Sequence, residues 1–236
     1  MELSGRSVVI TGVGRAGQLG EAVAAEFSAR GARVFLVDRH EAEAQGRADA
    51  LLAAGGRAAA LVADLTDPSQ VQALAERVRG ATGGRLHALV HLAGGFAASG
   101  PVADSDPTVW SGQFALHATT AYLVARAFIP QLRAAKGSIA FFASEAVLPG
   151  ARSAGLSAYA AAKGAVVSLM QAVAQEEAAS GVRANALAPT TIRTAANVAS
   201  MPAGTPMVTR EAVAAVVVWL CSEEARAVTG QLVPVR

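Results

Sequence analysis

Cysteine is nearly absent from this sequence of 236 residues, and Cys221 is the single one. A chain with one cysteine cannot form an internal disulfide, which is typical of proteins that work in a reducing compartment. Cys221 stands in the apolar run AVVVWLCSEE, so burial as a small hydrophobic side chain is its simplest role. We therefore expect a cytoplasmic protein that is stabilised by its core.

Charged residues are also few. They make up 16% of the chain, whereas hydrophobic residues make up 53%, which is the opposite of the composition of disordered proteins. The 20 basic and 18 acidic residues give a formal net charge of +2, and the basic residues are scattered along the chain. Nucleic-acid binding, which needs a clustered basic surface, is therefore not expected.

The sequence pattern also lacks membrane segments and metal sites. No apolar run reaches the roughly 18 residues that span a bilayer, and the residues after Met1, ELSGRS, do not resemble a signal peptide. The four histidines do not have metal-ligand spacing with cysteine or acidic residues; they are His40, His87, His91 and His117. We expect a soluble protein with no membrane partner and no metal.

The chain does contain a regular alternation of short apolar runs with helical patterns. The runs predict strands at residues 6–11, 32–38, 57–65, 86–95, 137–144, 182–189 and 231–235. The helical patterns cover residues 19–30, 41–54, 67–80, 107–134 (with a kink expected at Pro130), 157–179 and 211–223. This alternation indicates an α/β fold, in which helices cover both faces of a parallel sheet of seven strands. No linker or repeat divides the chain, so we predict one domain over residues 1–236.

A glycine-rich segment, GVGRAGQLG, separates the first predicted strand from its helix, and the second strand ends at Asp38. Glycines let a backbone approach a pyrophosphate closely, and the following helix N-terminus offers free N–H groups with positive potential. A carboxylate at the end of the second strand can accept hydrogen bonds from ribose hydroxyls. Strand, glycine loop, helix, strand and acid in this order predict a dinucleotide-binding unit.

The segment SEAVLPGARSAGLSAYAAAK begins at Ser144 and ends at Lys163. Tyr159 and Lys163 stand four residues apart in it, so they share one face if the segment is helical. A nearby ammonium lowers the pKa of a phenol, and such a phenol can exchange a proton with a carbonyl or alcohol oxygen. The Ser144 hydroxyl could hold the same oxygen. Taken alone, the spacing also fits an ordinary amphipathic helix.

In this order and spacing, the elements resemble the short-chain dehydrogenase/reductase family from Ser7 to Val235. The matching positions are Gly12, Gly17 and Gly20 in the glycine loop, Asp64-Leu65 after the third strand, Leu92-Ala93-Gly94 after the fourth, the Ser144/Tyr159/Lys163 set, and Thr194 after GVRANALAP. The resemblance implies a single-domain Rossmann fold, a nicotinamide cofactor, an alcohol or ketone substrate and a homo-oligomer, either a dimer or a tetramer.

The resemblance also implies a role for each residue. Tyr159 would be the acid/base, Lys163 would lower its pKa and bind the nicotinamide ribose, and Ser144 would orient the substrate oxygen. Residues expected at the cofactor are Gly12, Arg15, Gly17, Gln18, Leu19, Asp38, Arg39, Asp64, Leu65, Ala93, Gly94, Tyr159, Lys163, Pro189, Ile192 and Thr194. The loop or broken helix at 190–208 would cover the substrate.

The acid at the end of the second strand bears on the choice of cofactor. A 2′-phosphate beside Asp38 would meet a like charge, so we predict NAD over NADP. Arg39 and Arg15 offer guanidinium groups that could clamp such a phosphate, which leaves NADP open.

The sequence departs from the family pattern at several points. The glycine loop and the segment between Ser144 and Tyr159 are longer, His91 stands where the NNAG element begins, and His117 replaces an asparagine of the long helix. That asparagine is part of a proton path from the active-site lysine in the family, so His117 is a candidate catalytic residue. Packing is the second possible role for His117, and it is the expected role for His91.

Some of these residues also fit a purely structural role. Asp64 could act only as a helix cap, Thr194 only as a loop or cap hydroxyl, and Arg15 could be solvated. Trp110 and Phe114 are expected in the core. At the level of function, the chain could be a non-catalytic nucleotide-binding or sensor protein, or a structural subunit. A double-bond reductase of the enoyl type is disfavoured by the spacing of Tyr159 and Lys163.

Overall fold

The parallel sheet predicted from the alternation is present in the computed structural model, which describes residues 2–236. Its seven strands lie in the order β3-β2-β1-β4-β5-β6-β9, and every neighbouring pair is parallel. The strands are β1 (Ser7–Thr11), β2 (Arg33–Asp38), β3 (Arg57–Val62), β4 (Ala88–His91), β5 (Ser138–Phe142), β6 (Arg183–Pro189) and β9 (Leu232–Val235). The predicted doubly wound fold is therefore confirmed.

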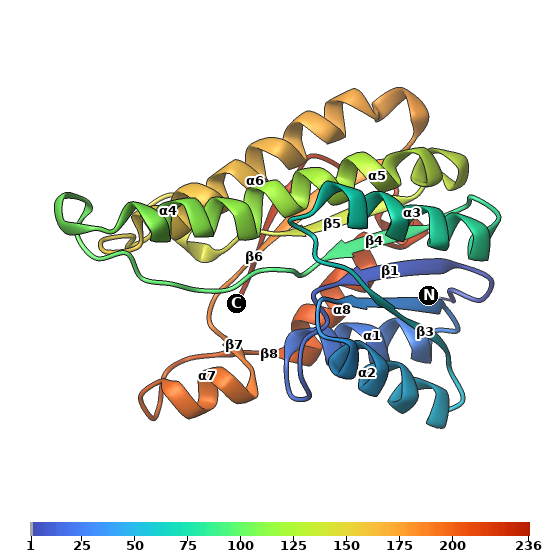
Figure 1. Cartoon of the computed structure of the whole chain (residues 1–236), viewed down its shortest axis with the longest axis horizontal. Helices are drawn as coiled ribbons and strands as arrows, with labels where there is room; N and C mark the ends of the chain where they lie inside the picture. The colour runs from blue at the N-terminus through green and yellow to red at the C-terminus, as the bar shows by residue number, and fades with distance from the viewer. Residues whose placement is uncertain (1) are drawn as a thin grey trace.

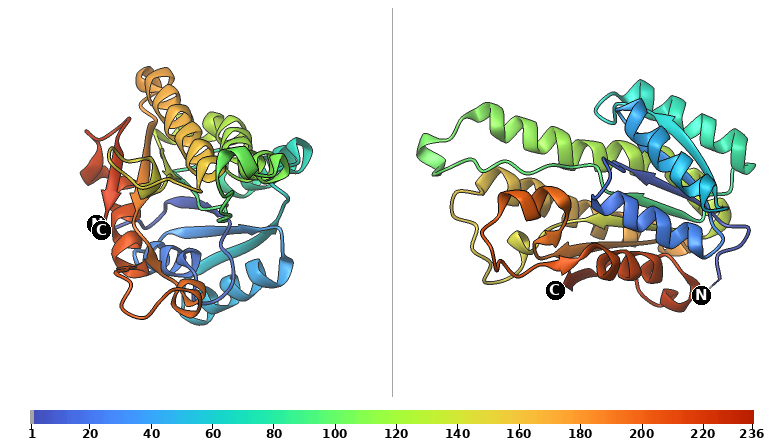
Figure 2. Two further views of the ribbon diagram at one scale, coloured as in Figure 1. Left: turned by 90° about the vertical axis from the view of Figure 1, so that its left-hand side faces the viewer. Right: turned by 90° about the horizontal axis from the view of Figure 1, so that it is seen from below.

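Helices cover both faces of this sheet. They are α1 (Leu19–Ala29), α2 (Glu41–Ala53), α3 (Pro68–Thr82), α4 (Pro107–Phe114), α5 (Thr120–Ala135), α6 (Ser157–Glu176), α7 (Ala195–Ser200) and α8 (Arg210–Leu220). Figure 1 shows α3, α4, α5 and α6 on one side of the sheet and α1, α2 and α8 on the other. The left view of Figure 2 shows the twisted sheet between these layers.

Two cores form because successive side chains of a strand point to opposite faces. In β1, Val9 packs with the core under α3, α5 and α6, whereas Val8 and Ile10 pack with the core under α1, α2 and α8. A strand buried on both faces needs apolar residues at nearly every position, which is why these segments are continuous apolar runs. Cys221 is buried in the second core, where desolvation raises the pKa of its thiol to about 11.

The long helix predicted at 107–134 is present, but it departs from α-helical hydrogen bonding at one place that was not predicted. Its departure from α-helical hydrogen bonding is a π-helical turn at Ala115–Thr119, between α4 and α5, and this turn carries His117. Pro130 lies inside α5, which continues past it to Ala135. Trp110 was also expected in the core, yet 47% of its surface is exposed. Its ring contacts that of Phe114 at a centroid distance of 4.8 Å, so its burial comes in part from a neighbouring aromatic side chain.

The segment predicted as a loop or broken helix at 190–208 contains α7 and a small second sheet. Its strands β7 (Ile192–Arg193) and β8 (Val208–Thr209) pair in parallel on either side of α7. Figure 1 places α7 beyond the carboxyl ends of the strands, on the side of the sheet opposite to α4. None of the helices within residues 2–236 is long and apolar enough to cross a membrane.

Candidate active site

A cavity of about 710 Å³ lies at the carboxyl ends of the strands, where β1 and β4 are neighbours. The chain leaves β1 toward β2 on one side and continues from β4 toward β5 on the other, so this is the switch point at which such sheets bind ligands. Residues that line the cavity are Gly12, Gly14, Arg15, Asp38, Arg39, His40, Glu43, Ala63, Asp64, Leu65, Thr66, Ala93, Gly94, Gly95, Leu116 and Thr120.

Close backbone packing shapes one wall of this cavity. Gly12 has a φ of +72°, and its amide donates to the carbonyl of Val37 at 2.8 Å. A Cβ at this position would lie 2.4 Å from the Cα of Ala93. Only glycine combines this left-handed backbone with so close an approach. The backbone just after β1 therefore packs directly against the backbone just after β4.

The carboxylate of Asp38 also lines the cavity and holds two backbone amides there. Its Oδ2 accepts from the amide of Gly14 at 2.9 Å, and its Oδ1 accepts from the amide of His40 at 3.1 Å. Each oxygen keeps acceptor capacity for a further donor. Arg39 is exposed beside it and donates through Nε to Nε2 of His40 at 3.1 Å.

Asp64 does not cap the helix that follows it. Its Oδ1 accepts from both the amide and the hydroxyl of Thr66, at 2.9 and 2.7 Å, and these bonds lower the pKa of the carboxyl. Asp67 is the cap of α3, because its side chain accepts from the amides of Ser69 and Gln70. The capping role considered for Asp64 is therefore wrong, and its carboxylate lines the cavity beside Leu65.

Tyr159 and Lys163 lie on one helix, as the spacing predicted. Both belong to α6, and Lys163 is buried with 7% of its surface exposed. Its Nζ donates to the carbonyl of Phe142 at 2.8 Å and lies 5.9 Å from the centre of the Tyr159 ring. Desolvation lowers the pKa of Lys163 to about 7.

The direction predicted for the Tyr159 pKa is not the one in this structure. Burial raises the pKa of the phenol, the Ser144 hydroxyl lowers it, and the nearby carboxylate of Glu145 raises it. Burial dominates because a phenolate loses hydration there. Ser144 also caps the short helix at Glu145–Val147, where its Oγ accepts from the amide of Ala146 at 3.2 Å.

His117 lies against the same tyrosine. The two rings meet edge to face at a centroid distance of 5.5 Å, and Nε2 of His117 lies 2.7 Å from the carbonyl oxygen of Gly95. A carbonyl only accepts, so Nε2 carries the proton and Nδ1 is a bare acceptor. Nδ1 is buried and has no partner among the described residues. Burial and then the charge of Lys163 lower the pKa of His117 to about 4.

Sequence analysis missed Phe96, which also contacts Tyr159. Its ring meets Tyr159 edge to face at 5.2 Å, yet 67% of its surface is exposed. The loop beyond it is held by hydrogen bonds from the amides of Ser99 and Gly100 to the carbonyl of Gly155. Its position in the sequence could have indicated this contact, because Phe96 directly follows Gly94 and Gly95 at the end of the fourth predicted strand.

Several predicted residues lie outside the lining of this cavity. Thr194 is the cap of α7, since its Oγ1 accepts from the amide of Asn197 at 3.2 Å, which is the structural role considered for it. The amide of Ala195 donates to the carbonyl of Gly17 at 3.0 Å. Within the described residues, those predicted but not lining the cavity are Gly17, Gln18, Leu19, His117, Ser144, Tyr159, Lys163, Pro189, Ile192 and Thr194.

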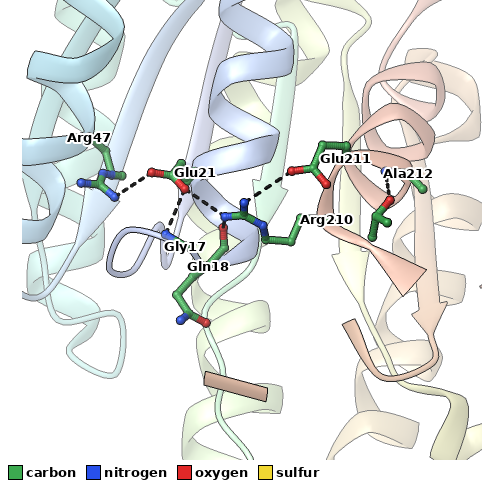
Figure 3. A network of polar contacts seen from close by, with 8 residues as sticks. Gly17, Gln18, Glu21, Arg47, Arg210, Glu211 and Ala212 are labelled. Atoms are coloured by element: carbon green, nitrogen blue, oxygen red, sulfur yellow. Dashed lines mark hydrogen bonds and ion pairs between the residues drawn. The ribbon is translucent and has the colours of Figure 1, made fainter. Parts of the chain in front are cut away.

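A charged cluster that sequence analysis also missed ties the glycine loop to three helices. Glu21, in the first turn of α1, accepts from the amide of Gly17 at 2.9 Å and pairs with Arg47 at 3.2 Å and Arg210 at 2.9 Å (Figure 3). Arg210 opens α8, directly after the segment that contains α7. Both ends of that segment are therefore bonded to the glycine loop or to α1, because Ala195 reaches Gly17 at its start.

This arrangement predicts that Arg210 tethers the α7 segment. Arg210→Ala should make the segment more sensitive to thermolysin, because Val198 and Met201 are exposed there and one anchor of their backbone is lost. Arg47→Ala is the matched control, since it removes the second ion-pair partner of Glu21 and leaves Arg210 in place. Cleavage rates followed by mass spectrometry test this, and equal rates in both variants would contradict it.

The sequence of this chain is similar to a family model and to dehydrogenases of known name. A family model described as "Enoyl-(Acyl carrier protein) reductase" matches residues 12–236. The chain is 34% identical to 2-(S)-hydroxypropyl-CoM dehydrogenase 3 of Xanthobacter autotrophicus, with 97% of this chain and 94% of the relative covered. It is 33% identical to meso-2,3-butanediol dehydrogenase of Serratia marcescens, with 100% and 94% covered.

Solved structures agree with these sequence matches. A short-chain type dehydrogenase/reductase from Mycobacterium ulcerans superimposes with a TM-score of 0.89 at 31% identity, covering 100% of this chain and 90% of the other. A 7 alpha-hydroxysteroid dehydrogenase, complexed with NADH and 7-oxo glycochenodeoxycholic acid, gives a TM-score of 0.89 at 25% identity, covering 99% and 94%. With the switch-point cavity and the Tyr159/Lys163 helix, these matches show that the chain belongs to the short-chain dehydrogenase/reductase family.

Proposed function

We propose that the protein is an NAD-dependent oxidoreductase that interconverts a secondary alcohol and a ketone, with Tyr159 as the acid/base. The observation that carries this proposal is the juxtaposition of Tyr159, Lys163 and Ser144 on adjoining elements at the carboxyl edge of the sheet. The relatives named above are dehydrogenases of small or bulky alcohols, which supports this reaction class.

The residues of the cavity fit a dinucleotide. The backbone at Gly12 and Ala93 forms a wall without protruding side chains, and Asp38 has acceptor capacity at the end of β2. The volume lies within the range of ligand sites in proteins, which is about 300–1,000 Å³. A bound nicotinamide would supply or accept the hydride, so the chain itself has to position the substrate and handle one proton.

The proton is handled by Tyr159. Its neutral phenol can donate to a ketone oxygen during reduction, and its phenolate can accept from an alcohol during oxidation. Ser144, which acts on the same phenol, would orient the substrate oxygen. The buried Lys163 would compensate the phenolate charge when it forms, since an opposite charge within a few ångströms favours ionisation.

The proposal is tested by turnover of purified protein with NAD and NADH. The panel contains small secondary alcohols and ketones, including 2,3-butanediol and acetoin, because one relative is named for the former. Absorbance at the nicotinamide band reports the reaction, and calorimetry reports cofactor binding. Turnover of any panel member supports the proposal. Binding of NADH without turnover of any member would favour a non-catalytic sensor.

Asp38 should favour NAD over NADP. We expect kcat/KM with NAD to exceed that with NADP by about tenfold or more, because a 2′-phosphate would meet the carboxylate. Asp38→Asn should lower the ratio of kcat/KM with NAD to kcat/KM with NADP. The amide oxygen can still accept from the amide of Gly14, but the negative charge that repels the 2′-phosphate is gone. A parent protein that prefers NADP would reject this and point to Arg39 or Arg15 as phosphate ligands.

We infer that His117 takes part in proton transfer, because its ring meets Tyr159 edge to face, the charge of Lys163 acts on it, and its bare Nδ1 is buried without a partner among the described residues. Its pKa of about 4 leaves it neutral at pH 7, and it becomes charged only as the pH falls through about 4. The parent should therefore lose kcat near pH 4, and His117→Asn should lack that ionisation. His117→Leu should reduce kcat more than it changes KM. Superimposable profiles for the parent and His117→Leu would assign the histidine to packing.

Protonation of His117 in acid should also weaken the fold. The folded-state pKa of His117 lies below its ordinary value of 6.5, so the unfolded chain binds the proton more tightly. Its contribution to stability is present above pH 6.5 and is lost progressively between pH 6.5 and about 4.

Two further properties stay predictions: assembly into a homo-oligomer, either a dimer or a tetramer, and a cytoplasmic location. A measurement of the molecular mass in solution tests the oligomeric state.

A further inference from the structure

His91 is the second histidine that departs from the family pattern, and it lies beneath the cavity at the end of β4. It is buried with 3% of its surface exposed, and both ring nitrogens are within hydrogen-bond distance of threonine hydroxyls. Nδ1 lies 2.8 Å from Oγ1 of Thr11 in β1, and Nε2 lies 3.1 Å from Oγ1 of Thr120, the first residue of α5. Thr11 and Thr120 are themselves almost fully buried.

The direction of these hydrogen bonds follows from counting protons. Thr120 Oγ1 lies 2.7 Å from the carbonyl oxygen of Leu116, which can only accept, so the single hydroxyl proton of Thr120 points there. Nε2 of His91 must then be the donor to Thr120, which leaves Nδ1 as the acceptor from Thr11. The chain of hydrogen bonds therefore runs in one direction, from Thr11 through His91 and Thr120 to Leu116.

This chain of hydrogen bonds ends inside the π-helical turn at Ala115–Thr119. Leu116 directly precedes His117, and a weaker contact of 3.3 Å joins Thr120 Oγ1 to the carbonyl of His117 itself. A π-turn departs from the regular hydrogen bonding of a helix and needs support from its surroundings. Here the support comes from β1 and β4, which lie in the interior of the sheet with a strand on either side of each.

The chemistry of His91 favours a structural use of its ring. Burial, then the charges of Lys163 and His117, lower the pKa of His91 to about 3, so the ring is neutral at working pH. With both nitrogens bonded to protein hydroxyls, the ring has no free position for a substrate proton.

We propose that His91 and Thr120 are positioning residues, which hold the π-turn so that His117 stays against Gly95 and Tyr159. The proposal rests on the proton-transfer role inferred above for His117. It explains two departures from the family pattern together, because the histidine at the start of the NNAG position supports the histidine that replaces the helix asparagine.

Thr120→Val tests this inference, since it removes the hydroxyl and keeps the shape of the side chain. We expect kcat to fall by about fivefold to tenfold while KM changes by less than about twofold, because His117 loses its position against Tyr159. Thr120→Ser should restore most of the activity, because it returns the hydroxyl. Thr82→Val is the matched control: Thr82 Oγ1 makes the same kind of bond, to the carbonyl of Val78 at 2.9 Å, far from the site.

A double-mutant cycle separates positioning from general stability. If Thr120 acts through His117, adding Thr120→Val to His117→Leu should cause no further loss of kcat. A merely structural role predicts that the two losses multiply, and that result would overturn the inference.

A spectroscopic readout keeps the test independent of turnover. Long-range ¹H–¹⁵N spectra of the imidazoles report which nitrogen carries the proton, and the four histidines can be assigned from single variants. Thr120→Val should shift the His91 and His117 signals, whereas Thr82→Val should leave both unchanged. Unchanged His117 signals in Thr120→Val would reject the positioning role even if the parent turned over no substrate. Shifted signals in a protein without turnover would instead count against the proposed function alone.

Discussion

Tyr159→Phe is expected to lower kcat by about 10² to 10⁴, which is the usual contribution of a general acid or base. The ring keeps its contacts with Phe96 and His117, so only the proton donor is lost. The dissociation constant of NADH should change by less than about twofold, because the phenol proton makes its contribution in the transition state. Initial rates and calorimetric binding on the same preparation measure both quantities.

The chain provides its own control for this substitution. Tyr122 is the only other tyrosine, and 52% of its surface is exposed on α5. Tyr122→Phe removes an equivalent hydroxyl away from the cavity and should leave kcat unchanged. If Tyr159→Phe kept activity within about a factor of two of the parent, Tyr159 would not be the acid/base.

Gly12→Ala is expected to cause the largest loss of stability. A left-handed backbone costs a residue with a Cβ about 1–2 kcal/mol. The new Cβ would also meet the Cα of Ala93 at 2.4 Å, and this overlap forces apart the ends of β1 and β4. Overpacking of this kind typically costs a further 1–3 kcal/mol or so. We therefore expect the free energy of unfolding to fall by about 2–5 kcal/mol in urea titrations, together with a loss of NADH binding.

Gly5→Ala separates the two contributions. Gly5 has a similar φ of +77°, but a Cβ there would meet nothing within 4 Å. The free energy of unfolding of the Gly5→Ala variant should fall only by the backbone contribution of about 1–2 kcal/mol, and the variant should still bind the cofactor. Equal destabilisation in the two variants would mean that the close approach to Ala93 contributes nothing.

Much of the fold could be predicted because its signals are local in sequence. Each strand of the sheet is an apolar run, and turn residues or helix caps such as Asp67 mark the boundaries. The π-turn was not predicted, and Pro130, where a kink was expected, lies inside α5. Proline is visible in the sequence, whereas the π-turn depends on Thr120 and His91, which come from different elements.

The candidate site divides in the same way. The spacing of Tyr159 and Lys163 was enough to place them on one face of a helix. The same spacing could not give the direction in which the pKa of Tyr159 is shifted. That direction depends on how much water the fold removes from the phenol and on a carboxylate at Glu145. The ion pair between Glu21 and Arg210 joins residues from opposite ends of the chain, and neither local sequence predicts it.

The sequence by itself determined the alternation of strands and helices, the glycine loop, the acid at the end of the second strand and the Tyr159/Lys163 pair. These depend on periodicity and on spacing within single elements, which the order of residues expresses directly. The tertiary structure alone decided which groups lose water, which backbone atoms meet, and which way the buried histidines hold their protons. Those properties arise from contacts between elements distant in sequence, such as β1, β4 and the π-turn before α5, whose positions are settled only when the two cores pack.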